Sequence, residues 1–285
     1  MAPLTKHRWR LLNNGAASGA WNMAVDEAIM EFCRQGRVPP TLRFYCWQPP
    51  CLSIGYFQEV GLDVDISKCL DLGIDLVRRP SGGKSILHDK EVTYSVASSE
   101  DDVLISGNIA QSHRKISAAI LQGLHSLGVK AEVGNSTLGL GESLRTAACF
   151  NMASEHEITV DGKKLVGSAQ VRRERMILQH GSIPLSLDSD KLFSVLKFSD
   201  EGQQQREIEH FRKRAISLEE SLGRKPELDE VVLALKRGFE EALGVLLAES
   251  VLTSYEVEAA EKLVREKYCT MGWNLERREC KRTNK

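Results

Sequence analysis

The chain has 285 residues, 42% of them hydrophobic and 27% charged, so it can bury a large core under an ordinary charged surface. Its formal net charge of −1 argues against a general nucleic-acid-binding protein, which would be strongly basic. The seven cysteines include no CxxC pair, which argues against zinc-ribbon and thioredoxin-like sites. No window approaches the ~20 apolar residues of a membrane helix. The first residues also lack the apolar core of a signal peptide, so we expect a cytoplasmic protein without a membrane partner.

The first half of the chain mixes helical and strand patterns. Trp21, Val25 and Ala28 recur on one helical face, and Gly36 follows as a stop signal. They predict a helix over 19–35. Alternating and short apolar runs predict strands over 42–47, 51–56, 74–77 and 92–96.

The second half becomes helical towards its end. The patterns predict a helix over 108–127, a strand over 129–133, a Gly-rich loop over 134–146, a hairpin joining 158–160 to 165–169, a strand over 176–185, and helices over 226–247 and 253–268. A capping box, Thr253 to Glu256, marks the start of the last helix. We therefore expect an α+β fold with a mixed or antiparallel sheet, built as a single domain over 1–285 whose part from about 188–285 is helical.

The central feature is the basic glycine-rich turn within Val77–His88, VRRPSGGKSILH. Gly82 and Gly83 let the backbone bend sharply and let a ligand approach closely. The positive charge of Arg78, Arg79 and Lys84 suits an anionic or carbonyl-bearing ligand, although for the turn taken alone a tight hairpin with solvated basic residues is favoured. A phosphate-binding P-loop does not fit, because Arg78 occupies a required glycine position and a strand follows the turn.

Four polar residues are candidates for chemistry. Cys149, after the Gly-rich loop, could be a nucleophile or a small buried filler. Lys164 could serve a site or be an exposed strand lysine, and His88 and His180 could be bases or structural residues. No catalytic triad is recognisable by spacing. Four other cysteines lie in helix or strand patterns and are expected to be packing residues: Cys33, Cys46, Cys51 and Cys69.

Taken together, several ordered motifs resemble the lipoate ligase and octanoyltransferase family, whose members share the catalytic fold of biotin protein ligases. The resemblance runs from about Trp9 to Asn274. It implies a biotin/lipoate protein ligase-like catalytic domain with a mixed, mostly antiparallel sheet flanked by helices. The motifs are Trp21-Asn22-Met23-Ala24 with Asp26-Glu27, Arg43-Phe44-Tyr45 with Trp47, Ser53-Ile54-Gly55-Tyr56-Phe57-Gln58, Arg78-Arg79-Pro80-Ser81-Gly82-Gly83, Leu87-His88-Asp89, Gly162 to Gln170, and His180-Gly181-Ser182.

Ala148-Cys149-Phe150 resembles the cysteine loop of the cysteine-dependent octanoyltransferases of lipoate biosynthesis. The resemblance implies that Cys149 carries octanoyl as a thioester and that Lys164 contacts the acyl carbonyl. The chain departs from the family pattern at Lys84-Ser85, where Arg-Gly or Gly-Ala is more usual, and Ser85 would narrow the pocket. The substrate-binding residues that the resemblance implies are Arg79, Ser81, Gly82, Gly83, His88, Gly167, Ser168 and Ala169.

The resemblance also implies the partners. Acyl carrier protein would donate octanoyl, and a lysine of a lipoyl-domain protein such as the glycine cleavage H protein would accept it. Exchange between thioesters is nearly balanced in energy, so neither ATP nor another cofactor is expected. Three alternatives stay open: an ATP-dependent lipoate ligase, an amidotransferase between lipoyl-domain proteins, and a non-catalytic adaptor. The basic run Arg172, Arg173 and Arg175 is either a docking patch for an acidic carrier or an ordinary solvated turn.

Overall fold

The computed structural model describes residues 7–134 and 157–278. Its larger sheet has the strand order β11-β1-β2-β6-β10-β9-β8-β7. β1 runs parallel to β2 and β11, and the other neighbours are antiparallel, so the expected mixed, mostly antiparallel sheet is confirmed. The strands are β1 Arg8–Ala17, β2 Thr41–Trp47, β6 Glu91–Ser99, β7 Glu132–Val133, β8 Ile158–Val160, β9 Lys163–Arg173, β10 Met176–Pro184 and β11 Leu246–Ser250.

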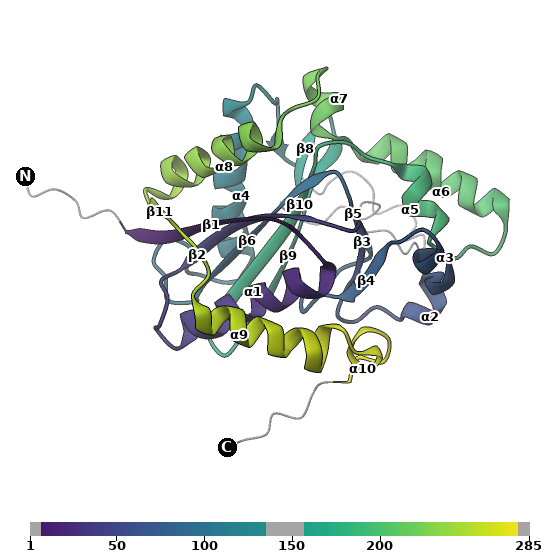
Figure 1. Ribbon diagram of the computed structural model, residues 1–285. Helices are drawn as coiled ribbons and strands as arrows, with labels where there is room; N and C mark the ends of the chain where they lie inside the picture. The colour runs from purple at the N-terminus through teal and green to yellow at the C-terminus, as the bar shows by residue number, and fades with distance from the viewer. Residues whose placement is uncertain (1–6, 135–156, 279–285) are drawn as a thin grey trace, which may run out of the picture.

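Helices cover both faces of this sheet (Figure 1). α4 (Ile109–Ser126) and α8 (Leu228–Leu243) pack on one face, and α1 (Gly19–Arg34) and α9 (Ser254–Leu263) on the other. Because side chains alternate along a strand, Phe44 enters the core under α4 and α8 while its neighbour Tyr45 enters the core under α1 and α9. β2 is therefore buried on both faces.

A second, three-stranded sheet lies beside the larger one, in the order β4-β3-β5. β3 (Cys51–Ile54) is parallel to β4 (Asp75–Arg78) and antiparallel to β5 (Ile86–His88). Short helices pack around it and share its core: α2 Val60–Asp63, α3 Ile66–Asp71, α5 Ser189–Ser194 and α6 Glu201–Arg214. α7 (Leu218–Leu222) follows α6 along the chain.

Most predicted elements are confirmed within a few residues. The capping box is present, with Thr253 Oγ1 accepting from the Glu256 amide, and α9 continues as a π-helix, Val264–Tyr268, before α10 (Met271–Asn274). The helix predicted over 226–247 is too long, because Gly244 takes a left-handed conformation and the chain then joins β1 as β11. The strand predicted over 129–133 is reduced to β7, and β1 and β5 are strands that the patterns did not reveal.

Two further findings bear on the sequence-based expectations. No helix in the described parts of the chain is long and apolar enough to cross a membrane. The Gly-rich loop predicted over 134–146 lies outside the described residues after Gly134.

Candidate active site

The glycine-rich turn connects β4 to β5 at the edge of the smaller sheet. Gly83 has φ +98°, and a side chain on Gly55 would collide with the Gly83 carbonyl oxygen, so the two glycines let the turn fold directly onto the end of β3. The sequence predicted a strand on each side of this turn. The strand that directly follows the turn is β5, and the strand predicted over 92–96 is β6, which comes next in the chain. The turn therefore joins two strands of the smaller sheet.

Arg78 does not offer its charge to a ligand. Its guanidinium donates to the carbonyl oxygens of Gly55, Tyr56 and Gln58 at 2.9, 2.8 and 2.9 Å. It also reaches the carbonyls of Trp273 at 3.1 Å and Asn274 at 3.0 Å, which ties α10 to the turn. Burial lowers the pKa of Arg78. The expectation of a ligand-binding charge is therefore wrong for Arg78, since five backbone carbonyls occupy its donors.

Arg79 holds the turn from inside the pocket. Its Nη2 donates to the carbonyls of Gly82 and Lys84, both at 2.8 Å, and its Nη1 donates to the Ser53 carbonyl and hydroxyl, both at 3.2 Å. The side chain is 3% exposed, so these bonds form away from water and fix the shape of the turn.

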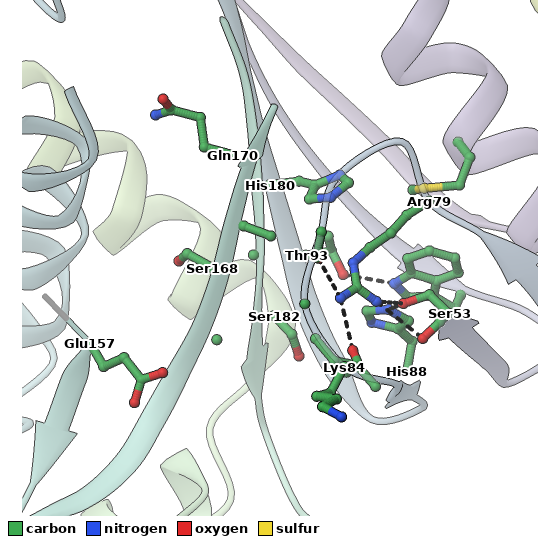
Figure 2. Close-up of a pocket in the computed structure, with 18 of the residues that line it drawn as sticks. Ser53, Arg79, Lys84, His88, Thr93, Glu157, Ser168, Gln170, His180 and Ser182 are labelled. Carbon is green, nitrogen blue, oxygen red and sulfur yellow. Dashed lines mark hydrogen bonds between the residues drawn. The ribbon is translucent and has the colours of Figure 1, made fainter. Parts of the chain in front are cut away.

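A cavity of about 340 Å³ lies between this turn and strands β9 and β10. Figure 2 shows Ser53, Arg79 and His88 on one side of it, and Glu157 and Ser168 on the other. Met23, Tyr45, Trp47 and Ile86 give the cavity an apolar part. Eight of the predicted residues line it: Arg79, Gly82, Gly83, His88, Lys164, Gly167, Ser168 and Ala169. Ser81 does not line it and lies behind the wall, hydrogen-bonded to His180.

Lys164 reaches this cavity from the start of β9. Its Nζ lies 2.5 Å from Oε1 of Glu157, and the two side chains are 6% and 9% exposed. The preceding Lys163 is more exposed, as alternation along the strand predicts. Glu157 was not predicted, because a glutamate just before a strand carries no sequence signal of a site.

His88 forms a closed hydrogen-bonded set with Ser53 and Glu91, which we call the His88 group. Its Nδ1 lies 2.7 Å from Glu91 Oε1, and its Nε2 lies 2.7 Å from Ser53 Oγ. Burial alone would raise the pKa of Glu91, but His88, Ser182 and Thr93 outweigh it and hold the pKa below its ordinary value. The indole of Trp47 stacks on the imidazole at 4.0 Å.

His180 forms a second set with Ser81 and Asp26, which we call the His180 group. Its Nε2 lies 2.5 Å from Ser81 Oγ, whereas its Nδ1 is 3.6 Å from Asp26 Oδ2. The Asp26 carboxylate already accepts hydrogen bonds from Arg43, Tyr45 and Ser95, at 2.6, 2.9 and 2.8 Å. Burial lowers the pKa of His180, so this group holds a neutral imidazole behind the turn.

The predicted nucleophile Cys149 lies outside the described residues. The four cysteines predicted to be packing residues all have protonated thiols. Burial raises the pKa of Cys33, Cys46 and Cys69 to about 11 and that of Cys51 well above its ordinary value. A buried thiol that keeps its proton is a poor nucleophile, which supports their packing role.

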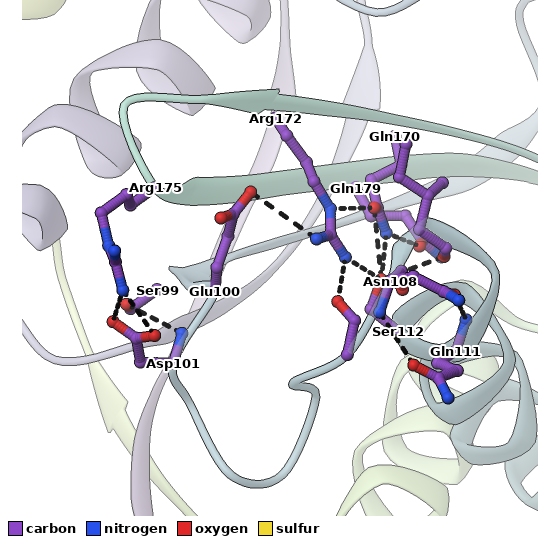
Figure 3. A network of polar contacts seen from close by, with 12 residues as sticks. Ser99, Glu100, Asp101, Asn108, Gln111, Ser112, Gln170, Arg172, Arg175 and Gln179 are labelled. Carbon is purple, nitrogen blue, oxygen red and sulfur yellow. Dashed lines mark hydrogen bonds and ion pairs between the residues drawn. The ribbon is translucent and has the colours of Figure 1, made fainter.

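The basic run on the β9–β10 turn is engaged within the protein (Figure 3). Arg172 donates to Gln170 Oε1 at 3.1 Å, to the Gly107 carbonyl at 2.9 Å and to Ser112 Oγ at 2.8 Å. Arg175 pairs with Asp101 at 2.7 Å. Since Gln170 lines the cavity, Arg172 supports the pocket wall. Arg175 fits the second alternative, an ordinary solvated turn, because its side chain is 74% exposed, whereas Arg172 is only 19% exposed and fits neither alternative.

Within the described residues, no three His, Cys, Asp or Glu side chains are grouped so that they could hold a metal ion. The site is instead a partly open, partly apolar cavity with a lysine and a glycine-rich turn at its wall. Together with the mixed sheet and its helices, these features define a lipoate ligase-like catalytic fold.

Comparisons with known proteins agree with this class. A model of the lipoyl protein ligase A/B catalytic domain matches residues 18–240, so the chain belongs to that family. It is 47% identical over 272 residues to octanoyltransferase LipM of Kyrpidia tusciae, covering 93% of this chain and 98% of that protein. It is 43% identical over 274 residues to octanoyltransferase LipM of Brevibacillus brevis, covering 95% of this chain and 99% of that protein.

A solved structure confirms the fold. The chain is similar to the structure of a bi-partite lipoate protein ligase from Thermoplasma acidophilum, described with its E2 lipoyl domain, with a TM-score of 0.82 and 28% identity. The match covers 97% of this chain and 100% of that one. The expected lipoate ligase-like architecture is therefore confirmed along almost the whole length.

Proposed function

We propose that this chain is an octanoyltransferase of lipoate biosynthesis. It takes octanoyl from acyl carrier protein, holds it as a thioester on Cys149, and passes it to a lysine of a lipoyl-domain protein such as the glycine cleavage H protein. The observation that carries the proposal is the cavity of about 340 Å³ in which Lys164 lies opposite the glycine-rich turn. The support from relatives is identity of 43% and 47% to two octanoyltransferases over nearly the full length.

The geometry suggests how the acyl group is bound. The apolar residues Met23, Tyr45 and Trp47 suit a hydrocarbon tail, and the ammonium of Lys164 suits the carbonyl oxygen. As a nucleophile attacks, negative charge develops on that oxygen, and a positioned ammonium stabilises it most in a site from which water is excluded. Glu157 holds the Lys164 ammonium in place until a carbonyl arrives.

The first chemical step needs no activated acid. The Cys149 thiolate attacks the carrier thioester, a new C–S bond forms, and the carrier thiol leaves. One energetically similar thioester replaces another, and the second step ends in a stable amide. An ATP-dependent ligase would instead hold the phosphates of ATP and then the single phosphate of an acyl-adenylate. Arg78 and Arg79 are poorly suited to that task, because their donors are used by backbone carbonyls.

The proposal is tested by incubating the protein with octanoyl-carrier protein without ATP and weighing the intact chain. We expect one octanoyl group, released by hydroxylamine, on the wild type and none on Cys149→Ala, which should stay folded. Added lipoyl-domain protein should then remove it. Hydroxylamine-sensitive acyl mass that persists in Cys149→Ala, or loading that requires ATP, contradicts the proposal. Transfer from an already octanoylated lipoyl domain, with none from the carrier, would identify an amidotransferase.

A further inference from the structure

The proposed reaction requires a proton acceptor. The amine of the acceptor lysine carries a proton that must leave its nitrogen as the amide forms. Among the described residues, two histidines line the cavity, His88 and His180, and their surroundings differ. Only His88 has a carboxylate within hydrogen-bond distance of Nδ1, at 2.7 Å.

The direction of each hydrogen bond in the His88 group can be deduced. Glu91 is ionised and therefore accepts only, so His88 Nδ1 carries a hydrogen and donates it to Glu91. The Nε2 atom of the neutral ring is then an acceptor, and the Ser53 hydroxyl donates to it at 2.7 Å. Ser53 Oγ in turn accepts from Arg79 at 3.2 Å. The lone pair that can take a proton is therefore on Nε2, and the Ser53 hydroxyl that bonds to it lines the cavity.

Within the part of the chain that the structure describes, Glu91 has no arginine or lysine among its hydrogen-bond partners. Besides His88 it receives the hydroxyls of Ser182 and Thr93, which are neutral. A buried carboxylate surrounded by neutral donors stabilises a positive charge on the adjacent imidazole. The Trp47 ring stacked on the imidazole, at 4.0 Å, favours the cationic form as well.

Other charged groups around His88 do not replace Glu91. Asp89 pairs with Lys191 at 2.8 Å, and Arg79 is bonded to the turn. Burial keeps the thiols of Cys46 and Cys51 protonated and lowers the pKa of His180. Among the described residues, the titratable and charged groups around the cavity include Tyr45, Cys46, Cys51, Arg79, Lys84, Asp89, Glu157, Lys164 and His180, together with Asp26 behind His180.

We propose that His88 accepts the proton of the attacking lysine through Ser53, and that Glu91 is the positioning residue that makes His88 able to do so. This inference rests on the proposed function. The neutral amine forms the C–N bond with its lone pair, and the C–S bonding electrons leave with the sulfur. The proton leaves the nitrogen for Ser53 Oγ as the Ser53 hydroxyl proton moves to Nε2. The imidazolium then returns the proton to the departing thiolate, so no co-reactant is needed.

The first test uses Glu91→Gln, which keeps shape and an acceptor for Nδ1 but removes the charge. The full-length enzyme is first loaded completely from an octanoyl thioester, and transfer to a lipoyl-domain protein is followed in a single turnover. We expect the rate constant to fall about 100-fold, with little change in KM for the acceptor.

The second test is chemical rescue of His88→Ala, with His180→Ala as the matched control. Both changes open a space of the same size at the cavity wall, but only the first removes a histidine bonded to a carboxylate. We expect free imidazole to restore transfer in His88→Ala and not in His180→Ala. This comparison holds even if Glu91→Gln fails to fold.

The two levels of proposal fail differently. A wild type that never acquires an acyl group overturns the proposed function and, with it, the inference. A wild type that loads normally, while Glu91→Gln and His88→Ala transfer at the wild-type rate, overturns the inference alone. Equal rescue of both alanine variants would also overturn it, since imidazole would then only be filling space.

Discussion

The His88 group and the His180 group contain the same kinds of residue in the same order, a serine, a histidine and a buried carboxylate. They differ in what compensates the carboxylate. Asp26 is bonded to Arg43 at 2.6 Å, with both side chains 0% exposed, so its charge is already balanced before His180 approaches. Glu91 accepts hydrogen bonds from two neutral hydroxyls and from the His88 imidazole. The difference shows that two similar sets of residues can leave their carboxylates in different electrostatic states, one balanced by arginine and one bonded to histidine.

The comparison extends across the cavity to Glu157. This carboxylate is bonded to Lys164, as Asp26 is to Arg43. Of these three carboxylates, two therefore have a permanent cation and one has a histidine. Changes at the charged residues of these groups, and at the turn to which they are attached, test the comparison.

Arg43→Met should have the largest effect, on stability. It leaves Asp26 buried without its cation, which costs about 3–5 kcal/mol of unfolding free energy. Glu91→Gln should cost only about 1–2 kcal/mol, because the amide oxygen can still accept from His88 and Thr93 while the amide nitrogen donates to the Ser182 hydroxyl oxygen. Urea unfolding of both variants measures the difference. Equal losses would mean that the charge of Glu91 is as important to the fold as that of Asp26.

Lys164→Ala should lower the acyl-transfer rate by about 100- to 1,000-fold, the usual effect of losing one group that stabilises the oxyanion. Lys164→Arg should not restore the rate, because the planar guanidinium places its donors differently from an ammonium. Rates with octanoyl-carrier protein, checked against the thermal stability of each variant, test this. Lys163→Ala is the control on the neighbouring position and should keep near-normal rates.

Gly83→Ala should disturb the turn to which both groups are attached, the His88 group through Arg79 and the His180 group through Ser81. With φ at +98°, an alanine is strained by about 1–2 kcal/mol. Activity should fall before stability does, because the turn lines the cavity. Transfer rates with octanoyl thioesters and with longer-chain thioesters measure the effect. Normal rates with both would place the acyl tail elsewhere.

The smallest effect concerns the pH dependence of stability. Burial lowers the pKa of His180 below its ordinary value of 6.5, so only the unfolded chain takes up this proton as the pH falls through about 6.5. Stability should therefore decrease towards acid below that pH, by at most about 1.4 kcal/mol per pH unit. His180→Gln should remove this component of the slope. An unchanged slope between pH 6.5 and 5 would show that the buried histidine is protonated in the folded protein.

The sequence by itself predicted the longer helices, most of the central strands and the outline of the site, but not β1, β5 or β11. The 3.6-residue period located α1 and α4, the capping box located α9, and the glycine-rich turn and the hairpin before Lys164 located two walls of one cavity. These signals are local, because helix caps, turns and face periodicity depend on residues close together in the chain.

Only the tertiary structure decided which charges meet. Arg10 pairs with Glu256, Arg43 with Asp26, and Arg78 with five carbonyls from two distant segments, and no local pattern reports such contacts. The pairing of β11 with β1 is equally non-local. The sequence of a glycine-rich turn is the same whether its arginine binds a ligand or donates to backbone carbonyls. The packing of the strands and helices around it selects one, because a buried guanidinium must find acceptors wherever the fold provides them.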